Sequence, residues 1–552
     1  MPHSRRALIK ASGITAVGLG LSGCIGDSDT DDGDHGEPVE DIELSVTTAD
    51  FDPLRHEMAL LTSAQWEELG FTVDIETYSL AAFIDKILPP SEIHAAVDLW
   101  TGGVERIDPH QWLTNLYHSS HSGGGSGFNY TQYENPEYDQ LADAQRATLD
   151  VEARRELVFE CQEIIAEDQP ATIICHPTMV MPYNSDRWSN PVVSVGEGLR
   201  SFWNLLEIEP AAGVTEFRYG YPADAERLNP LEQGTATGRR LMRQLFDPLM
   251  RQDAEGEPIP WAAEEVEIVD DETISVTLRD GMTFHDGEPV TIDDVYFSYN
   301  YHVEHNATFA DLIEGVDNMS IEGEDGIVFE LDQPDAVFLF GGMTQTPIIP
   351  QHIWENVPDE ADVDEPIDWR DEQARIGSGP FKFLEWRRGE VLRFEAFEDH
   401  FQPPTYEVFS YVPGSDTGAL SRALEQGNID MLARTPSVDA IPQLEAHDHI
   451  TMTTTENTGF YQVGYNTQVA PFDDRAVRRA LAYAVPKQEI VDTLLDGHGI
   501  VSHSPITSAL PWNNPDVKQF NLDLDAARDE LSNAGYTWDD DGQIHYPVEP
   551  ED

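Results

Sequence analysis

The stretch that decides the fold runs from Thr273 to Asn300 and reads TISVTLRDGMTFHDGEPVTIDDVYFSYN. Apolar and polar residues alternate from Ile274 to Leu278, which predicts a half-buried β-strand. Two turn dipeptides follow, Asp280-Gly281 and Asp286-Gly287, so a short return strand is expected between them at Met282 to Phe284. The first half of the stretch therefore predicts a strand and a tight hairpin.

The second half of the stretch predicts a helix. Thr291 stands three residues before Asp294, which is the spacing of a capping box, and Val295 and Tyr299 follow at helical spacing. Strand and helix patterns also alternate earlier in the chain, with strands expected at 41–46, 71–75, 95–100 and 172–175 and helices at 53–69, 81–88, 140–148 and 151–166. This alternation favours an α/β lobe with a largely parallel sheet.

The composition is strongly acidic. The 552 residues include 103 Asp and Glu against 32 Lys and Arg, a formal net charge of -71. Such a chain repels nucleic acid and anionic membranes, so neither is expected as a partner. Since 40% of the residues are hydrophobic, folded lobes are expected rather than disorder. The acidic residues are spread over the whole length, which fits a protein adapted to high salt, where screening removes self-repulsion. This indicates that the source is a halophile, in the first place an archaeon.

The N-terminus has the pattern of an export signal. Arg5-Arg6 begins a twin-arginine motif, and the apolar run Ala11 to Leu21 is too short to span a bilayer. Leu21-Ser22-Gly23-Cys24 is similar to a lipobox, which would make Cys24 the lipidated first residue of the mature protein. Residues 1–24 are therefore expected to be the signal and 25–40 an acidic flexible tether.

The sequence resembles the extracytoplasmic solute-binding proteins of peptide- and nickel-type ABC importers (family 5). The opening stretch is similar to that family's signature segment. Further motifs follow it in the family's order, namely Ile376-Gly-Ser-Gly-Pro-Phe381, Leu424-Glu-Gln-Gly-Asn-Ile-Asp430, Gly464-Tyr-Asn466, Pro471-Phe-Asp-Asp474 and Ala534-Gly-Tyr536. The resemblance implies a two-lobed α/β fold of the periplasmic-binding-protein type (type II, with an extra subdomain).

The order of the family's segments is cyclically shifted in this chain. Phe217 to Pro230 is similar to the family's mature start, whereas Ala95 to Asp139 is similar to its far end. We therefore expect a circular permutant, with Glu207 to Glu216 as the joint between the old ends and Ile544 to Tyr546 close to Asp41. The alternative is a fusion of two truncated domains. The expected parts are 41–186 and 456–547 for one lobe, and 187–455 for the other, with the extra subdomain at about 250–385.

The family's ligand cleft implies which residues bind the solute. An acidic residue three positions after Trp100 would hold a peptide ammonium, but that position is Gly103, and Glu105 and Asp108 are the nearest carboxylates. The loop that would carry an Arg for the ligand carboxylate, 48–53, has no cation. Both charged dipeptide anchors are therefore absent. The expected substrate-binding residues are Phe51, Trp100, Gly103, Asp108, Gly234, Thr235, Tyr461 and Asn466. For a peptide ligand, Asp108 or Glu105 would replace the absent acid, with Asp108 favoured; alternatively, Asp108 only shapes the turn before Pro109. For a sugar ligand, Trp100, Trp112, Tyr461 and Phe51 could stack on it.

Signatures of catalysis are absent from the sequence: there is no G-x-S-x-G elbow, no P-loop and no H-E-x-x-H. We therefore expect no enzyme and no cofactor. His118 and His121 have metal-ligand spacing without a third ligand, so solvated loop histidines are favoured. Cys161 and Cys175 could form a disulfide, but two buried free thiols are favoured.

The expected function is that of a lipid-anchored extracellular receptor. It would be a monomer that delivers a small polar organic solute, in the first place a peptide, to an ABC permease. Two other classes stay open, a metal or metallophore carrier that uses the histidines and a secreted hydrolase.

Overall fold

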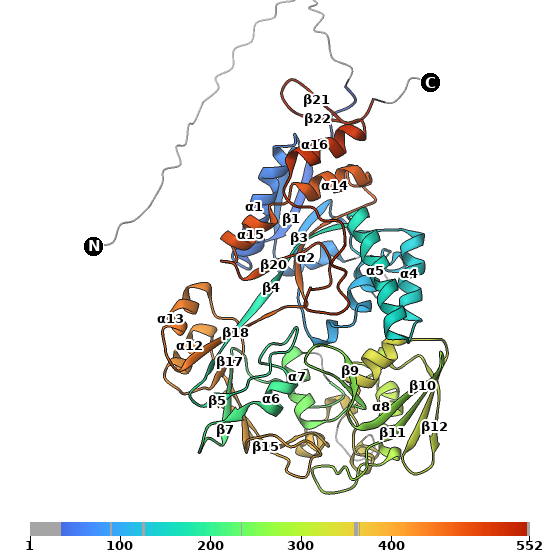
Figure 1. Cartoon of the computed structure of the whole chain (residues 1–552), viewed down its shortest axis with the longest axis vertical. Coiled ribbons are helices and arrows are strands. Elements are labelled where there is room, and N and C mark those ends of the chain that lie inside the picture. Colours follow the sequence, from blue (N-terminus) through green and yellow to red (C-terminus); the bar gives the residue numbers. More distant parts are fainter. Residues whose placement is uncertain are drawn as a thin grey trace, which may run out of the picture.

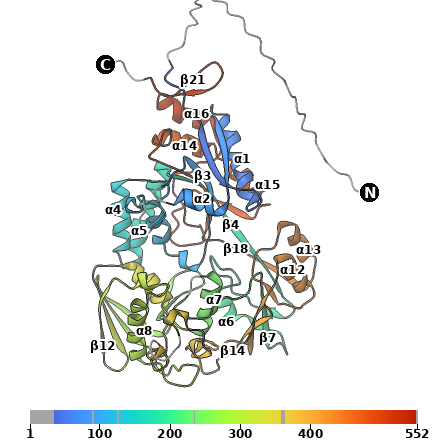
Figure 2. The same ribbon diagram turned by 180° about the vertical axis from the view of Figure 1, so that it is seen from behind.

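The chain forms two lobes joined at a narrow waist (Figures 1 and 2). The structure is a computed structural model that describes residues 35–88, 91–123, 127–232, 235–357, 363 and 365–548. We call the lobe that holds both ends of the described chain the terminal lobe and the other the middle lobe. No helix in these residues is long and apolar enough to cross a membrane.

The terminal lobe is built on one half of a long mixed sheet. The strands in spatial order are β2 (Val73–Tyr78), β1 (Ile42–Thr47), β3 (Ala95–Trp100), β19 (Phe460–Tyr465) and the first half of β4 (Ala171–Asn184). β1 runs parallel to β2 and β3, whereas β19 runs antiparallel to β3 and β4. The expected α/β alternation at 41–100 is thereby confirmed.

Helices cover both faces of this sheet half (Figure 1). The apolar side chains of α1 (Pro53–Glu67), α14 (Arg475–Tyr483) and α16 (Leu524–Asn533) share one core with β1 and β19. A second core contains side chains of α3 (His110–Tyr117), α4 (Pro136–Arg146) and α5 (Val151–Asp168). The lobe also holds α2 (Leu80–Ile87), α15 (Lys487–Thr493), β20 (Gly499–Val501), β21 (Thr537–Trp538) and β22 (Ile544–His545).

Two long strands connect the lobes. β4 is 14 residues long, pairs with β19 and β20 in its first half, and pairs with β18 (Ile450–Glu456) farther on. It reaches β17 (Met431–Leu432) in the middle lobe at Tyr183. The expected strand at 172–175 is therefore much longer than its sequence pattern indicated, because β18 and β20 pair with the continuation.

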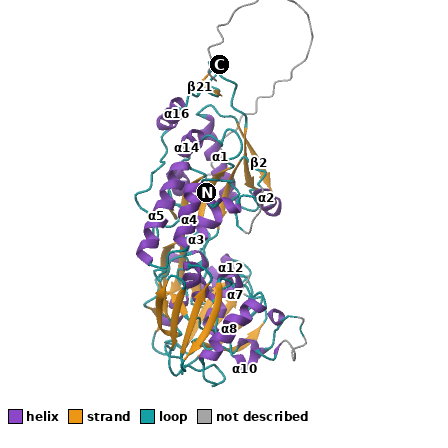
Figure 3. Cartoon of the chain, turned by 90° about the vertical axis from the view of Figure 1, so that its right-hand side faces the viewer, coloured by secondary structure: helices purple, strands orange, loops and turns teal. Residues whose placement is uncertain are grey.

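The middle lobe continues the long sheet and adds a second one. β7 (Glu216–Tyr221), β16 (Val408–Pro413), β15 (Val391–Ala396) and β14 (Phe381–Arg387) extend the first sheet beyond β17. A separate sheet has the order β10 (Ala263–Asp270), β11 (Thr273–Leu278), β13 (Gly326–Leu331) and β12 (Val316–Glu322), with α8 (Ile292–Glu304) packed beside it (Figure 3).

The remaining elements of this lobe are short: α6 (Phe202–Glu207), α7 (Ala236–Leu245), a π-helical turn (Phe338–Gly342), α9 (Met343–Gln345), α10 (Gln351–Trp354), α12 (Thr417–Glu425), α13 (Ile441–Glu445), β5 (Trp188–Ser189), β6 (Glu209–Pro210), β8 (Met250–Gln252) and β9 (Pro258–Pro260).

The stretch quoted first is confirmed in two of its three parts. Its strand is β11, and the backbone N–H of Thr291 donates to the carboxylate of Asp294 at 2.9 Å to cap α8. The expected return strand at 282–284 is wrong. Only an isolated bridge between Thr283 and Pro289 forms there, because β11 finds its partners in β10 and β13.

The two ends of the described chain lie side by side. Val39 N–H donates to the carbonyl of Ile544 at 3.0 Å, and Tyr546 N–H donates to that of Glu37 at 2.9 Å. The expected approach of 544–546 to the strand that begins near Asp41 is confirmed, and the last residues of the expected tether take part in the pairing.

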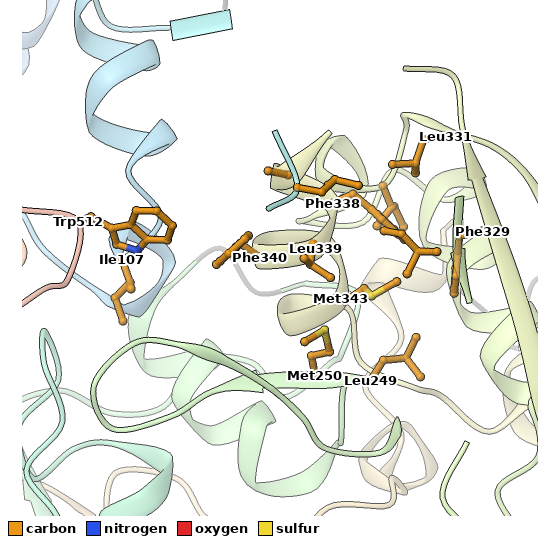
Figure 4. Close-up of a cluster of buried hydrophobic side chains, with 14 of the residues drawn as sticks. Ile107, Leu249, Met250, Phe329, Leu331, Phe338, Leu339, Phe340, Met343 and Trp512 are labelled. Atoms are coloured by element: carbon orange, nitrogen blue, oxygen red, sulfur yellow. The ribbon is translucent and has the colours of Figure 1, made fainter. Parts of the chain in front are cut away.

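Apolar side chains also meet across the waist (Figure 4). Trp512 and Ile107 of the terminal lobe share a core with Phe340 and Met250 of the middle lobe, and the rings of Phe340 and Trp512 are 5.7 Å apart. Burying a side chain of this size contributes about 1.5–3 kcal/mol, so these contacts favour a closed arrangement of the lobes.

Candidate functional site

Two adjoining cavities lie between the lobes. The first encloses about 420 Å³, open solvent included, and the second about 660 Å³. Gln252 and Gln345 line both. The first is further lined by Val104, Ile107, Ser194, Val195, Glu197, Ser201, Phe202, Trp203, Arg243, Arg251, Asp253 and Thr344. A concave, mixed polar and apolar space between two lobes is where a small ligand can be enclosed.

Paired charges form one wall of the first cavity. Glu197 accepts hydrogen bonds from Arg240 at 3.1 Å and Arg243 at 3.3 Å. Arg243 also donates to the amide oxygen of Gln345 at 3.1 Å. The wall thus presents both a carboxylate and guanidinium groups, which suits a ligand that carries charge or amide groups.

Aromatic side chains form another part of the lining of the first cavity. The guanidinium carbon of Arg251 lies 3.7 Å from the ring centre of Phe202, and Trp203 donates its indole N–H to the carbonyl of Gln252 at 2.8 Å. The carboxylate oxygen Oδ1 of Asp247 accepts a hydrogen bond from Arg251 at 3.2 Å and another from the indole N–H of Trp261 at 2.6 Å. Burial lowers the pKa of Arg251 to about 10, and its charge persists at neutral pH.

The second cavity has an acidic wall. It is lined by Asp108, Gln111, Gln252, Thr308, Phe309, Asp311, Leu312, Val337, Phe340, Gly341 and Gln345. Burial raises the pKa of Asp311 above its ordinary value. Asp311 lines this cavity from the middle lobe, and Asp108 lines it from the terminal lobe.

Asp108 is already engaged by a buried cation. Arg154 on α5 donates to both of its carboxylate oxygens, at 2.8 and 2.9 Å, and the backbone N–H of His110 donates to one of them at 2.8 Å. The side chain of Arg154 is fully buried. Asp108 therefore lines the second cavity with its carboxylate already paired to Arg154, and it also accepts the N–H of His110 in the turn around Pro109.

Of the other expected binding residues, Gly103 adjoins a residue that lines the first cavity, whereas Trp100 lines neither cavity. Gly103 precedes the lining residue Val104, and its backbone N–H donates to the hydroxyl of Thr458 at 2.9 Å. Trp100 packs against Phe128 and Tyr130, with ring centres 5.7 and 6.4 Å away, so its ring is engaged inside the terminal lobe.

Four further expected residues lie away from both cavities. Phe51 is exposed beside Arg55, and Thr235 caps α7 through the N–H of Gly238. Tyr461 is buried in the core beneath β19, and the amide of Asn466 donates to the carbonyl of Ile93 at 3.0 Å. Gly234, Cys24 and the side chain of Glu105 lie outside the described residues.

The histidines and cysteines take structural places. His118 is mostly buried, with its Nε2 3.3 Å from a carboxylate oxygen of Asp143, so the expectation of a solvated loop histidine is wrong for it. Within the described residues, no three His, Cys, Asp or Glu side chains gather as a metal site would require. Cys161 and Cys175 are buried free thiols, as favoured by the sequence, and burial raises the pKa of each to about 12.

Sequence reasoning missed the middle-lobe wall of the site. Glu197, Phe202, Arg243 and Gln345 come from separate loops and helices, and no motif marks them. The adjacent aromatic residues Phe202-Trp203 were the one available signal, since a loop that presents two large rings often contacts a ligand.

The comparisons with known proteins agree on one family. The model of "Bacterial extracellular solute-binding proteins, family 5 Middle" matches residues 257–551, more than half of the chain. The oligopeptide-binding protein AppA of Bacillus subtilis is 32% identical over 271 residues, 47% of this chain and 48% of that protein. The nickel-binding periplasmic protein of Escherichia coli is 24% identical over 334 residues, 59% of this chain and 62% of that protein.

A solved structure of AppA from Bacillus subtilis in complex with a nonapeptide aligns with a TM-score of 0.44 and 24% identity. The alignment covers 60% of this chain and 67% of that one. The sequence match to AppA spans about half of that relative's length.

Proposed function

Since the chain belongs to the bacterial extracellular solute-binding proteins of family 5, we propose that it is a receptor that captures a small polar organic solute for an ABC importer. A peptide is the first candidate. The observation that carries this proposal is the pair of cavities between two lobes that the paired strands β4 and β18 connect.

The chemistry of the cavity walls favours a peptide over a sugar. Peptide amide groups can exchange hydrogen bonds with Gln252 and Gln345, which line both cavities. A peptide's charged groups can interact with the Glu197–Arg243 pair that borders the first cavity and with Asp311, which lines the second. The aromatic group around Phe202 can accommodate an apolar side chain.

A thermal-shift screen in concentrated KCl tests this function, with peptides of two to nine residues, sugars, amino acids and Ni²⁺. A ligand at a hundredfold excess over its Kd stabilises by about 2.7 kcal/mol, so a bound peptide should raise the melting temperature clearly. Gln345→Ala should weaken the response, whereas Gln443→Ala, on the exposed face of α13, should not. Turnover of a peptide would identify a hydrolase, and a response to Ni²⁺ alone would identify a metal carrier.

The proposed site of action is the outer face of the cell membrane, where the protein would work as a lipid-anchored monomer beside its permease. The support is the sequence Arg5-Arg6 followed by the lipobox that ends at Cys24. Cys24→Ser should release the exported protein into the medium. Replacing Arg5-Arg6 with Lys-Lys should leave the precursor inside the cell, and a protein that stayed membrane-bound as Cys24→Ser would exclude this anchor. The charge of -71 further supports a source with high internal or external salt.

The proposal includes a circular permutation of the family's order. It is supported by the pairing of 36–39 with 544–546, which brings the described ends together. The expected joint at 207–216 contains an exposed turn at Ala211 to Val214, closed by a backbone hydrogen bond of 3.0 Å. A short surface turn there is what the fusion of two neighbouring ends would leave.

A further inference from the structure

Four oxygen atoms without hydrogen-bond partners gather inside the terminal lobe. They are Thr47 Oγ1 on β1, Asp98 Oδ1 on β3, Gln462 Oε1 on β19 and the hydroxyl of Tyr117 on α3, and none of them is paired with any described residue. Their side chains are at most 3% exposed. Buried polar atoms are almost always paired, so a group of four calls for an explanation.

Three of these side chains lie on the same face of three adjacent strands. Gln462 is directly opposite Asp98 in the antiparallel pair of β19 and β3, and its amide N–H donates to Asp98 Oδ2 at 3.4 Å. Ser45 pairs with Ala96 in the parallel register of β1 and β3, which sets Thr47 beside Asp98. Residues that are lateral neighbours in a sheet point to the same side.

The side chain of Tyr130 covers this face of the sheet. The hydroxyl of Tyr130 accepts a hydrogen bond from Gln462 at 2.9 Å, and it lies so close to the sheet that a Cβ added at Gly464 would be 2.0 Å away. Burial raises the pKa of Tyr117 above its ordinary value, and the charge of Asp98 raises it further. Asp98, Gln462 and Thr47 therefore lie together on the sheet face that Tyr130 covers.

The group carries one negative charge that the protein does not balance. Asp98 forms no ion pair with a described residue, and Arg55, whose charge lowers the pKa of Asp98, already pairs with Asp52 at 2.7 Å. Burial raises the pKa of Asp98 to about 7, although Tyr130, Gln462 and Arg55 each lower it. An unbalanced buried carboxylate is costly, and a bound cation would relieve that cost.

We propose that Asp98, Gln462 and Thr47 hold a single monovalent cation, Na⁺ or K⁺, inside the terminal lobe. Carboxylate, amide and hydroxyl oxygens are hard ligands that suit such ions, and one carboxylate neutralises one positive charge. Ca²⁺ in proteins is bound by six to eight oxygens that usually include several carboxylates, which this group does not supply. The ion would tie β1, β3 and β19 together two residues before Trp100.

Thermal unfolding at pH 8.5 and constant total salt tests the site. NaCl or KCl is exchanged stepwise for choline chloride, whose cation is too large to enter. For the parent protein the melting temperature should rise with the logarithm of the Na⁺ or K⁺ concentration. Asp98→Asn should lose this cation-specific part, whereas Asp74→Asn, on the exposed face of β2, should keep it. The salt series, NaCl or KCl, in which the melting temperature rises more steeply identifies the ion.

Two further measurements decide the case if Asp98→Asn does not fold. Thr47→Val keeps the shape and the charge but removes one oxygen, so it should need a several-fold higher cation concentration for the same shift. Crystals soaked in thallium(I) should show an anomalous peak beside Asp98. Equal responses of the parent and Thr47→Val, or crystals without that peak, would overturn the proposal. A protonated Asp98 or a buried water would then account for the unpaired oxygen atoms.

Discussion

Arg146 on α4 of the terminal lobe and Asp335 of the middle lobe form a two-pronged ion pair across the waist. The Nη2–Oδ2 and Nε–Oδ1 distances are 2.7 and 3.1 Å. The hydrogen bonds to Asp335 raise the pKa of Arg146, and Asp335 is nearly buried. Together with the contact between Phe340 and Trp512, this pair holds the lobes in their closed arrangement.

Replacing Arg146 with Gln should favour the open arrangement. Since the side chain of Arg146 is 40% exposed, the loss should be modest, about 0.5–1 kcal/mol. Small-angle X-ray scattering of the unliganded protein should report a larger radius of gyration. The affinity for a ligand found by the screen should fall several-fold, and less so at high salt, where the pair is screened.

Arg475→Gln is the matched control. It removes an exposed ion pair with Asp168, at 3.1 Å, that lies wholly within the terminal lobe. If both variants change the radius of gyration equally, the pair of Arg146 and Asp335 does not control closure.

Replacing Asp108 with Asn should destabilise the whole protein rather than only weaken a ligand. The variant leaves the guanidinium of Arg154 buried without a counter-charge, which costs about 3–5 kcal/mol. Urea unfolding measures this loss. The double variant Asp108→Leu/Arg154→Met should recover much of the stability, because a well-packed apolar pair can replace a buried ion pair. Unchanged stability of the single variant would mean that solvent reaches Arg154.

The local features were predictable from sequence, because neighbours in the chain determine them. The strand of β11 and the capping box of Thr291 and Asp294 each depend on residues a few positions apart. The length of β4 was not predictable, since the prolines at 177 and 182 argue against a strand and only the pairing with β18 and β20 reveals it.

The candidate site was predictable only in part, for the same reason. Asp108 was identified from its place after Trp100, but its partner Arg154 is 46 residues away on another helix. Glu197 and Gln345 are 148 residues apart in the sequence, and both accept hydrogen bonds from Arg243 only in the folded middle lobe. Pairs that tertiary packing brings together leave no local pattern in the sequence.

Lys487 should make the stability of the protein depend on pH above neutrality. Its amino group is buried against His503, 3.0 Å away, and Cys175 is also near. Burial lowers the pKa of Lys487 to about 7 from its ordinary 10.5. Between these values the unfolded chain binds more protons than the folded one, so the contribution of Lys487 makes stability rise with pH across this interval.

Lys487→Met isolates this contribution. The variant should be more stable than the parent at pH 7, by about 1–3 kcal/mol, because an unbalanced buried amine is replaced by an apolar chain of similar length. The difference should shrink as the pH approaches 10. His503 Nδ1 keeps a donor in the backbone N–H of Phe520, at 3.2 Å, whereas the carbonyl of Ser502 loses the hydrogen bond of 3.2 Å that it accepts from Lys487, which reduces the gain. Parallel stability curves for the two proteins between pH 7 and 10 would contradict the assignment.

Restoring the family's order of segments should leave the fold intact. A chain of residues 214–547, a short Gly/Ser linker and residues 37–213 opens the exposed turn at Gly213 and closes the described ends. Those ends are already adjacent, since the N–H of Tyr546 and the carbonyl of Glu37 are 2.9 Å apart, so the linker imposes little strain. Its stability in urea should match that of residues 37–547 to within about 1 kcal/mol, the scale of a change in loop-closure entropy. The control has the same linker but opens β19 between Val463 and Gly464. It should not fold, because β19 pairs with both β3 and β4. If the restored order also fails to fold while 37–547 folds, the two halves of the chain are not interchangeable in order and the permutation proposal is wrong.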